Sequence, residues 1–210
     1  MDTQWAVDNL QTIRTLMERS AVYRRALAPI MLICGISGLA GGFAGWQWHL
    51  NSNQAFVVVW VATAFFALGC STLLVRQQAL RESEPFWSPP TRRVCQALLP
   101  AFLVGLMVAV FVIIFEGRSV DIIQQYLVIM LWTWIYGCAA HAAGFFLPRG
   151  VRWLGWIFVL VGSVLPLVFS WSENHEKVVS SHLLMGGIFG GLHLTYGIYL
   201  YFTEKKNPIA

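Results

Sequence analysis

Six long apolar stretches limit what this chain can fold into. They run over residues 27–46, 55–75, 94–115, 122–147, 151–171 and 182–202, and Arg152 at the edge of the fifth is the only Lys or Arg within them. Each stretch has about 20 residues or more, and an α-helix of that length crosses the ~30 Å hydrocarbon core of a bilayer. The sequence therefore predicts six membrane-spanning helices.

The basic residues that separate these stretches fall on alternate sides of the predicted membrane. Only Arg118 and Lys177, of the 14 Lys and Arg residues, fall on the side opposite to the rest. The others are Arg14, Arg19, Arg24, Arg25, Arg76, Arg81, Arg92, Arg93, Arg149, Arg152, Lys205 and Lys206. Loops rich in Lys and Arg stay in the cytoplasm, so we expect both termini to be cytoplasmic.

Composition places the chain among membrane proteins and leaves no room for a soluble catalytic domain. Hydrophobic residues make up 57% of the chain and charged residues 11%. The predicted fold is all-α, with a six-helix bundle over residues 27–203 and a cytoplasmic tail over 204–210. Residues 1–26 are predicted to form an amphipathic helix on the cytoplasmic face, because apolar residues recur there at helical spacing.

Few groups within the spans could do chemistry. The middle of each span contains no Asp, Glu, Lys or Arg, which argues against proton pumps, ion-coupled carriers and voltage sensors. We find no catalytic motif and no Cys or His spacing typical of a metal site, so the sequence predicts no enzyme, no metal and no cofactor. The polar side chains at depth include His141, His193, Tyr136 and Tyr196.

The last span has the most informative pattern. Gly186, Gly190, His193 and Gly197 follow one another at steps of four, three and four residues, which predicts one shared helix face. Small residues at this spacing let two helix backbones come close together, and His can form a hydrogen bond across the contact. We expect this face to pack against the first span at Gly38 and Gly42, against the fourth span beside His141, or against both.

Two tryptophans and two histidines raise alternatives that the sequence leaves open. Trp132 and Trp134 lie near the middle of the fourth span, where an indole N–H needs an acceptor, so at least one should face a neighbouring helix or a cavity. His141 and His193 could ligate a haem as two axial ligands. Their depths differ by ~5 Å at 1.5 Å per residue, which is unfavourable for a shared haem.

Short segments spread along the chain suggest a family. They are Glu18-Arg19-Ser20, Trp87-Ser88-Pro89 followed by Arg92-Arg93, and the segment Gly191–Phe202. These segments resemble a group of small, uncharacterised bacterial inner-membrane proteins of similar length and helix count, for which no activity is established. The resemblance implies location and topology, and it directs attention to His193 and Tyr196 in the last span.

The sequence thus predicts a non-enzymatic, multi-pass protein of the bacterial inner membrane. We expect it to bind or sense a small apolar or amphiphilic ligand, or to serve as an accessory of a membrane complex. One alternative is a haem-binding electron-transfer subunit, and another is a carrier or channel for an uncharged solute. The expected partners are the lipid bilayer and a second membrane protein or a second copy of the chain, with no nucleic acid.

Overall fold

The computed structural model describes residues 26–81, 86–87, 89–115, 120–170 and 180–204, and the regular structure in them is all helical. Six helices are long and apolar enough to cross a membrane, which indicates a multi-pass membrane protein. The first, which we call the first span, is Ala26–Gln47. It is followed by α2 (Asn53–Arg81), α3 (Pro89–Phe115), α4 (Ile122–Ala143) and α5 (Arg149–Ser170). The last crossing, which we call the sixth span, comprises α6 (Ser181–Met185), η2 (Gly186–Gly191) and α7 (Leu192–Glu204).

Several predicted features lie outside the described residues. The amphipathic helix expected over residues 1–26 does so apart from Ala26, and so does the tail after Glu204. Arg118 and Lys177, the two basic residues assigned to the side opposite to the rest, are also outside them.

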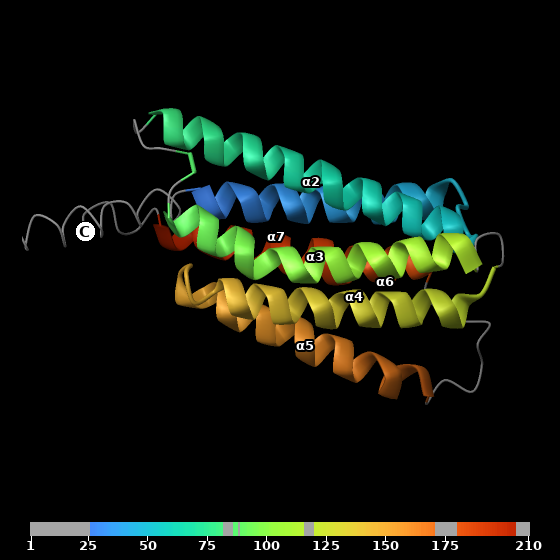
Figure 1. Cartoon of the computed structure of the whole chain (residues 1–210). Helices are drawn as coiled ribbons and strands as arrows, with labels where there is room; N and C mark the ends of the chain where they lie inside the picture. Colours follow the sequence, from blue (N-terminus) through green and yellow to red (C-terminus); the bar gives the residue numbers. More distant parts are fainter. Residues whose placement is uncertain (1–25, 82–85, 88, 116–119, 171–179, 205–210) are drawn as a thin grey trace, which may run out of the picture.

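Consecutive helices run in opposite directions, so the bundle has two different ends (Figure 1). We call one end the basic end, because α2 finishes there at Arg81 and α5 begins there at Arg149. We call the other the amide end, because Asn53 at the start of α2 meets Gln124 and Gln125 at the start of α4.

Local sequence explains two differences between predicted and observed helix ends. α2 continues past the predicted end at Val75 as far as Arg81, because residues 76–81 are mostly good helix formers that do not need to be apolar beyond the hydrocarbon core. α4 stops at Ala143 rather than at the predicted Leu147, because the backbone hydrogen bonds tighten beyond Gly144. Phe145 N–H donates to the carbonyl oxygen of Ala142 at 3.3 Å and Phe146 N–H to that of Ala143 at 2.9 Å, which close turns one residue shorter than those of an α-helix.

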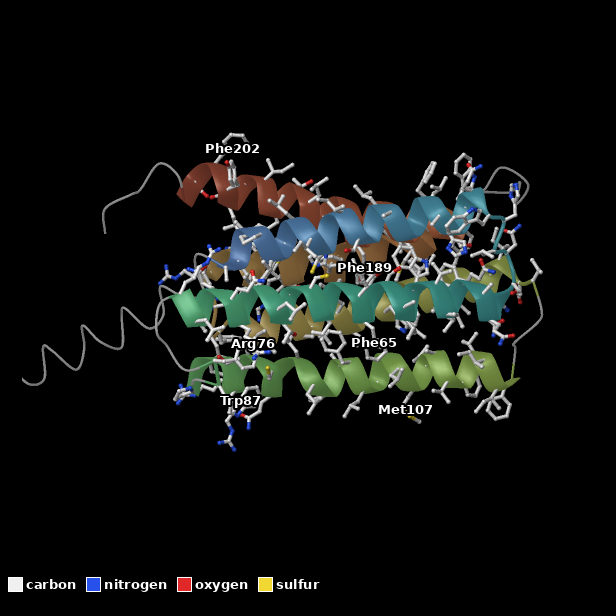
Figure 2. The ribbon with its side chains drawn as sticks, turned by 90° about the horizontal axis from the view of Figure 1, so that it is seen from above. Phe65, Arg76, Trp87, Met107, Phe189 and Phe202 are labelled. Carbon is white, nitrogen blue, oxygen red and sulfur yellow. The ribbon has the colours of Figure 1, made fainter. Side chains whose placement is uncertain are left out.

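Side chains from α2, α4 and α5 form the centre of the bundle. Phe56, Ile129, Thr133 and Phe158 are each fully buried there. α3 lies further out, since it exposes most of its large apolar side chains. Met107 on α3 is 67% exposed and points away from the other helices (Figure 2). A wide apolar surface of this kind is what a helix presents to lipid or to another membrane protein.

Candidate functional site

A pair of buried polar side chains joins α4 to the sixth span. The Tyr136 hydroxyl on α4 lies 2.5 Å from Nε2 of His193 on α7, and His193 Nδ1 lies 2.6 Å from the carbonyl oxygen of Phe189. Because a carbonyl oxygen can only accept, Nδ1 is the nitrogen that carries a proton and donates it. In the neutral imidazole, Nε2 is then an acceptor for the Tyr136 hydroxyl. Both ring nitrogens of His193 are therefore occupied within the protein.

Aromatic rings enclose this pair. The Tyr136 ring lies 4.8 Å from that of Phe158 and 5.3 Å from that of Phe189, and the His193 ring lies 5.3 Å from that of Phe158, measured between centroids. His193 is 4% exposed and Phe158 is fully buried. If the two side chains separated in surroundings this apolar, no water would be at hand to replace the hydrogen bond that each of them loses. The Tyr136–His193 bond is therefore expected to persist unless another polar group replaces it.

The helix that leads to His193 is irregular. Residues Gly186–Gly191 form a π-helical turn, in which backbone hydrogen bonds span one residue more than in an α-helix. This turn contains Phe189, whose carbonyl oxygen accepts the His193 Nδ1 proton. Glycine spacing did not predict the π turn, although two pairs of glycines in six residues are a signal of weak helical preference. Such turns occur frequently at functional sites.

The glycines of the sixth span pack against the backbone of the first span. A methyl group on Gly190 would lie 2.5 Å from the backbone nitrogen of Leu39, and one on Gly186 would lie 3.2 Å from the Gly42 Cα. Both distances are shorter than an ordinary contact of a Cβ atom. Of the two partners considered from sequence, the first span is thus the one that meets the glycines. Gly144, which directly follows α4, lies instead against Arg152 of α5.

The single shared face predicted for the sixth span is divided in the structure. Gly197 contacts Leu32 of the first span, whereas His193 points to Tyr136 on α4. Gly187 and Gly191, the other two glycines of this segment, have no neighbouring atom within 4 Å of the place that a methyl group would take. The extra residue of the π turn shifts the helical phase, so strict steps of three and four do not hold along this segment.

Both mid-span tryptophans find acceptors on neighbouring helices. Trp132 Nε1 donates to the carbonyl oxygen of Gly105 on α3 at 3.1 Å, and Trp134 Nε1 donates to Ser163 Oγ on α5 at 3.1 Å. These bonds tie α4 to its two neighbours. They therefore give Trp132 and Trp134 a packing role separate from the Tyr136–His193 pair.

The other two predicted site residues lie in contacts of their own, nearer the basic end. The His141 ring packs between Phe145 and Trp156, and its Nδ1 is buried without a hydrogen-bond partner among the described residues. The Tyr196 ring covers Gly150 at the start of α5, where a methyl group would lie within 2.3 Å of the Tyr196 hydroxyl oxygen. The predicted set is therefore distributed over several contacts rather than gathered into one site.

A second buried polar cluster, at the amide end, was not predicted. Asn53 donates through Nδ2 to Gln124 Oε1, and its Oδ1 accepts from Gln125 Nε2 at 3.1 Å. Gln125 Nε2 also donates to the backbone carbonyl oxygen of Asn51 at 2.7 Å. Asn53 is 1% exposed and Gln125 is 6% exposed. These bonds connect the segment between the first span and α2 to the start of α4.

His182 closes the same end of the bundle from the sixth span. Its Nε2 donates to the carbonyl oxygen of Leu50 at 2.9 Å, and its ring centroid lies 5.0 Å from that of Phe56. The ring fills the space beside Gly45, where a methyl group would be 2.1 Å from Nδ1. His182 therefore has a structural role at this end.

The geometry does not favour the haem alternative. An axial ligand needs a free imidazole nitrogen. Those of His193 are bonded to Tyr136 and to the backbone of Phe189. Within the part of the chain that the structure describes, no three His, Cys, Asp or Glu side chains form a group able to hold a metal ion.

Comparison with known protein families, with curated proteins and with solved structures finds no match to this chain.

Proposed function

We propose that this chain is a non-enzymatic, multi-pass protein of the bacterial inner membrane that binds or senses a small amphiphilic ligand. Both termini would lie in the cytoplasm, because the basic end of the bundle would face it. Arg76, Arg81 and Arg149 belong to that end, and only two of the 14 Lys and Arg residues are assigned to the other side.

The observation that carries the proposal is the hydrogen bond between Tyr136 and His193 beside the π turn. Two polar groups buried in a membrane protein can separate only if each finds a new partner. A ligand with one hydroxyl group can supply both partners, because the hydroxyl can donate to His193 Nε2 and accept from the Tyr136 hydroxyl. Its apolar part replaces contacts with Phe158 and Phe189. The ligand class is therefore an amphiphile with a single small polar group.

The π turn offers a way for such binding to change the protein. If the π turn changed into an α-helix, its backbone hydrogen bonds would each span one residue fewer. This change in phase by one residue would rotate α7 relative to α6 by about 100°. The change would move His193 away from Tyr136 and carry the cytoplasmic end of the sixth span with it. Binding of a ligand to the separated state would shift the population toward it.

The deep polar groups support a binding role over catalysis. Tyr136 and His193 bond to each other, and Trp132, Trp134 and Thr133 bond to backbone or hydroxyl oxygens. General acid–base chemistry needs a group that can exchange a proton with a substrate. The paired groups in these spans present no such arrangement.

Photoaffinity labelling of the purified protein in nanodiscs tests the proposal. The probe is a long-chain alcohol that carries a diazirine, and we expect it to label the peptides around Tyr136 and His193. Tyr136→Phe should reduce this labelling, whereas Tyr199→Phe, at a side chain that is 60% exposed, should not. Labelling spread evenly over α3 and α5, and equal in both variants, would contradict a ligand site at the pair.

The exposed apolar surface of α3 favours an accessory role as a second candidate. Apart from Thr91, its only buried residues are Ala109 and Val112 among those that the structure describes. A photoreactive amino acid at Met107 should then capture one defined membrane protein in native membranes, whereas the same amino acid at the exposed Leu167 of α5 should not. Lipid adducts alone at both positions would argue against this candidate.

A further inference from the structure

Four side chains form a continuous row where α4 and α5 meet at the basic end. The ring centroids of Trp156 and His141 are 5.3 Å apart, and those of His141 and Phe145 are 5.4 Å apart. The guanidinium carbon of Arg152 lies 5.1 Å from the centre of the Phe145 ring. The row thus combines one fixed cation, one imidazole and two aromatic rings.

Glycines on the two helices make this arrangement possible. A methyl group on Gly144 would lie 2.4 Å from Arg152 Cγ, and one on Gly155 would lie 2.5 Å from the backbone nitrogen of His141. The helices therefore touch at the backbone, and the stem of Arg152 lies across Gly144. This position directs the guanidinium onto the Phe145 ring, where a cation is attracted by the π electrons.

The row lies near the ends of two candidate spans, where we expect the lipid headgroups to be. α4 ends as a candidate span at Ala143 and α5 begins at Arg149, so the four residues lie within about two turns of these span ends. Phe145 is 64% exposed and Trp156 is 49% exposed. Exposed aromatic rings at this depth are positioned to contact the upper part of an acyl chain.

The cation in this row has no anionic partner in the described part of the chain. Asp121 is the only acidic side chain that the structure describes, and it caps α4 at the amide end, the opposite end of the same helix. Within the row itself, at the basic end, His141 Nδ1 is buried without a hydrogen-bond partner among the described residues. The row therefore has a positive charge to be neutralised and an unpaired polar atom close beside it.

We propose that this row binds the phosphate group of an anionic phospholipid, at a site separate from the Tyr136–His193 pair. The Arg152 guanidinium holds the phosphate, because its planar fork matches two phosphate oxygens. Phe145 and Trp156 contact the acyl chain, and a phosphate that reaches His141 gives its ring a hydrogen bond that it otherwise lacks. Free phosphate shares the headgroup chemistry, but the exposed rings and the membrane depth favour a lipid.

Native mass spectrometry of the full chain tests this site, using phosphatidylglycerol and phosphatidylcholine with identical acyl chains. We expect wild-type protein to retain phosphatidylglycerol in preference to phosphatidylcholine, and Arg152→Gln to reduce that preference about fivefold. Arg149→Gln is the matched control. It removes the same charge from the same turn of α5, but it does not change a side chain of the row, so the preference should persist.

Phe145→Leu provides a second variant, since it leaves every charge in place and removes the ring that positions the guanidinium. It should also weaken the preference for phosphatidylglycerol. An equal loss in Arg149→Gln and Arg152→Gln would overturn the proposal, because it would show a general effect of surface charge. Release of the bound lipid by millimolar inorganic phosphate would overturn the assignment to a lipid and identify a site for free phosphate.

Discussion

Gly38 and Gly190 bring the first and sixth spans into backbone contact, since a methyl group on Gly38 would lie 2.8 Å from the Gly190 Cα. Helices in a bilayer are not driven together by the hydrophobic effect, because lipid tails are as apolar as their side chains. Close packing of this kind is what holds them together. The contact fixes the sixth span on one side while His193 reaches α4 on another.

Gly190→Ala should therefore destabilise the protein in detergent by about 1–3 kcal/mol, because the new methyl group would overlap the backbone of Leu39. Gly187→Ala is the matched control, since nothing lies within 4 Å of that position. It should leave stability unchanged or raise it by up to about 1 kcal/mol. Thermal unfolding followed by circular dichroism measures both, and equal effects would mean that the close contact is absent.

Asn53→Ala should open the amide end, because it leaves the side-chain amides of Gln124 and Gln125 without their buried partner. We expect a loss of about 2 kcal/mol or more in the free energy of unfolding. Asn51→Ala should have little effect, because Gln125 bonds to the backbone oxygen of Asn51 and not to its side chain. A larger loss in Asn51→Ala than in Asn53→Ala, measured in urea or by heating, would contradict the observed network.

Reporter fusions test the membrane orientation. Fusions after Pro148 and after Ala210 should both report a cytoplasmic location, because the sequence assigns the positive residues before these points to the cytoplasmic side. A fusion after Asn51 should report the opposite side. A periplasmic signal from either of the first two fusions would contradict the six-span topology with cytoplasmic termini.

The protein as purified should show no haem absorption band, because both nitrogens of His193 are engaged in hydrogen bonds. The absorption spectrum around the Soret region measures this directly. A Soret band that disappears in His193→Ala or His141→Ala would restore the electron-transfer alternative.

Sequence alone could predict the helices but not all of their ends. The length of each apolar stretch indicated a helix able to cross the membrane, since the thickness of the bilayer sets the minimum length of such a helix. The ends depend on local chemistry instead. α4 tightens into shorter turns after Ala143, before the apolar stretch finishes, and α2 continues to Arg81 although most of its last residues are polar. Neither of these two helix ends could be predicted from the hydrophobicity of the residues.

The candidate site was only partly predictable for a similar reason. Glycine spacing correctly indicated contact with Gly38 and Gly42, because close approach requires the absence of a side chain. The partner of His193 could not be found in this way, since Tyr136 lies on a helix distant in sequence and the π turn changes the phase of the helix. Phe158 and Phe189, which enclose the pair, resemble any other apolar residue of a span.

Solid-state NMR of isotope-labelled His193 in lipid tests the central claim most directly. We predict that Nδ1 carries the ring proton, and that Nε2 carries none and accepts from Tyr136. Tyr136→Phe should change the Nε2 resonance, and Tyr199→Phe should leave it unchanged. Addition of a long-chain alcohol should shift the wild-type Nε2 resonance as the ligand replaces Tyr136. A proton found on Nε2, or a Nε2 resonance that responds neither to Tyr136→Phe nor to the alcohol, would contradict a ligand-responsive pair at this position.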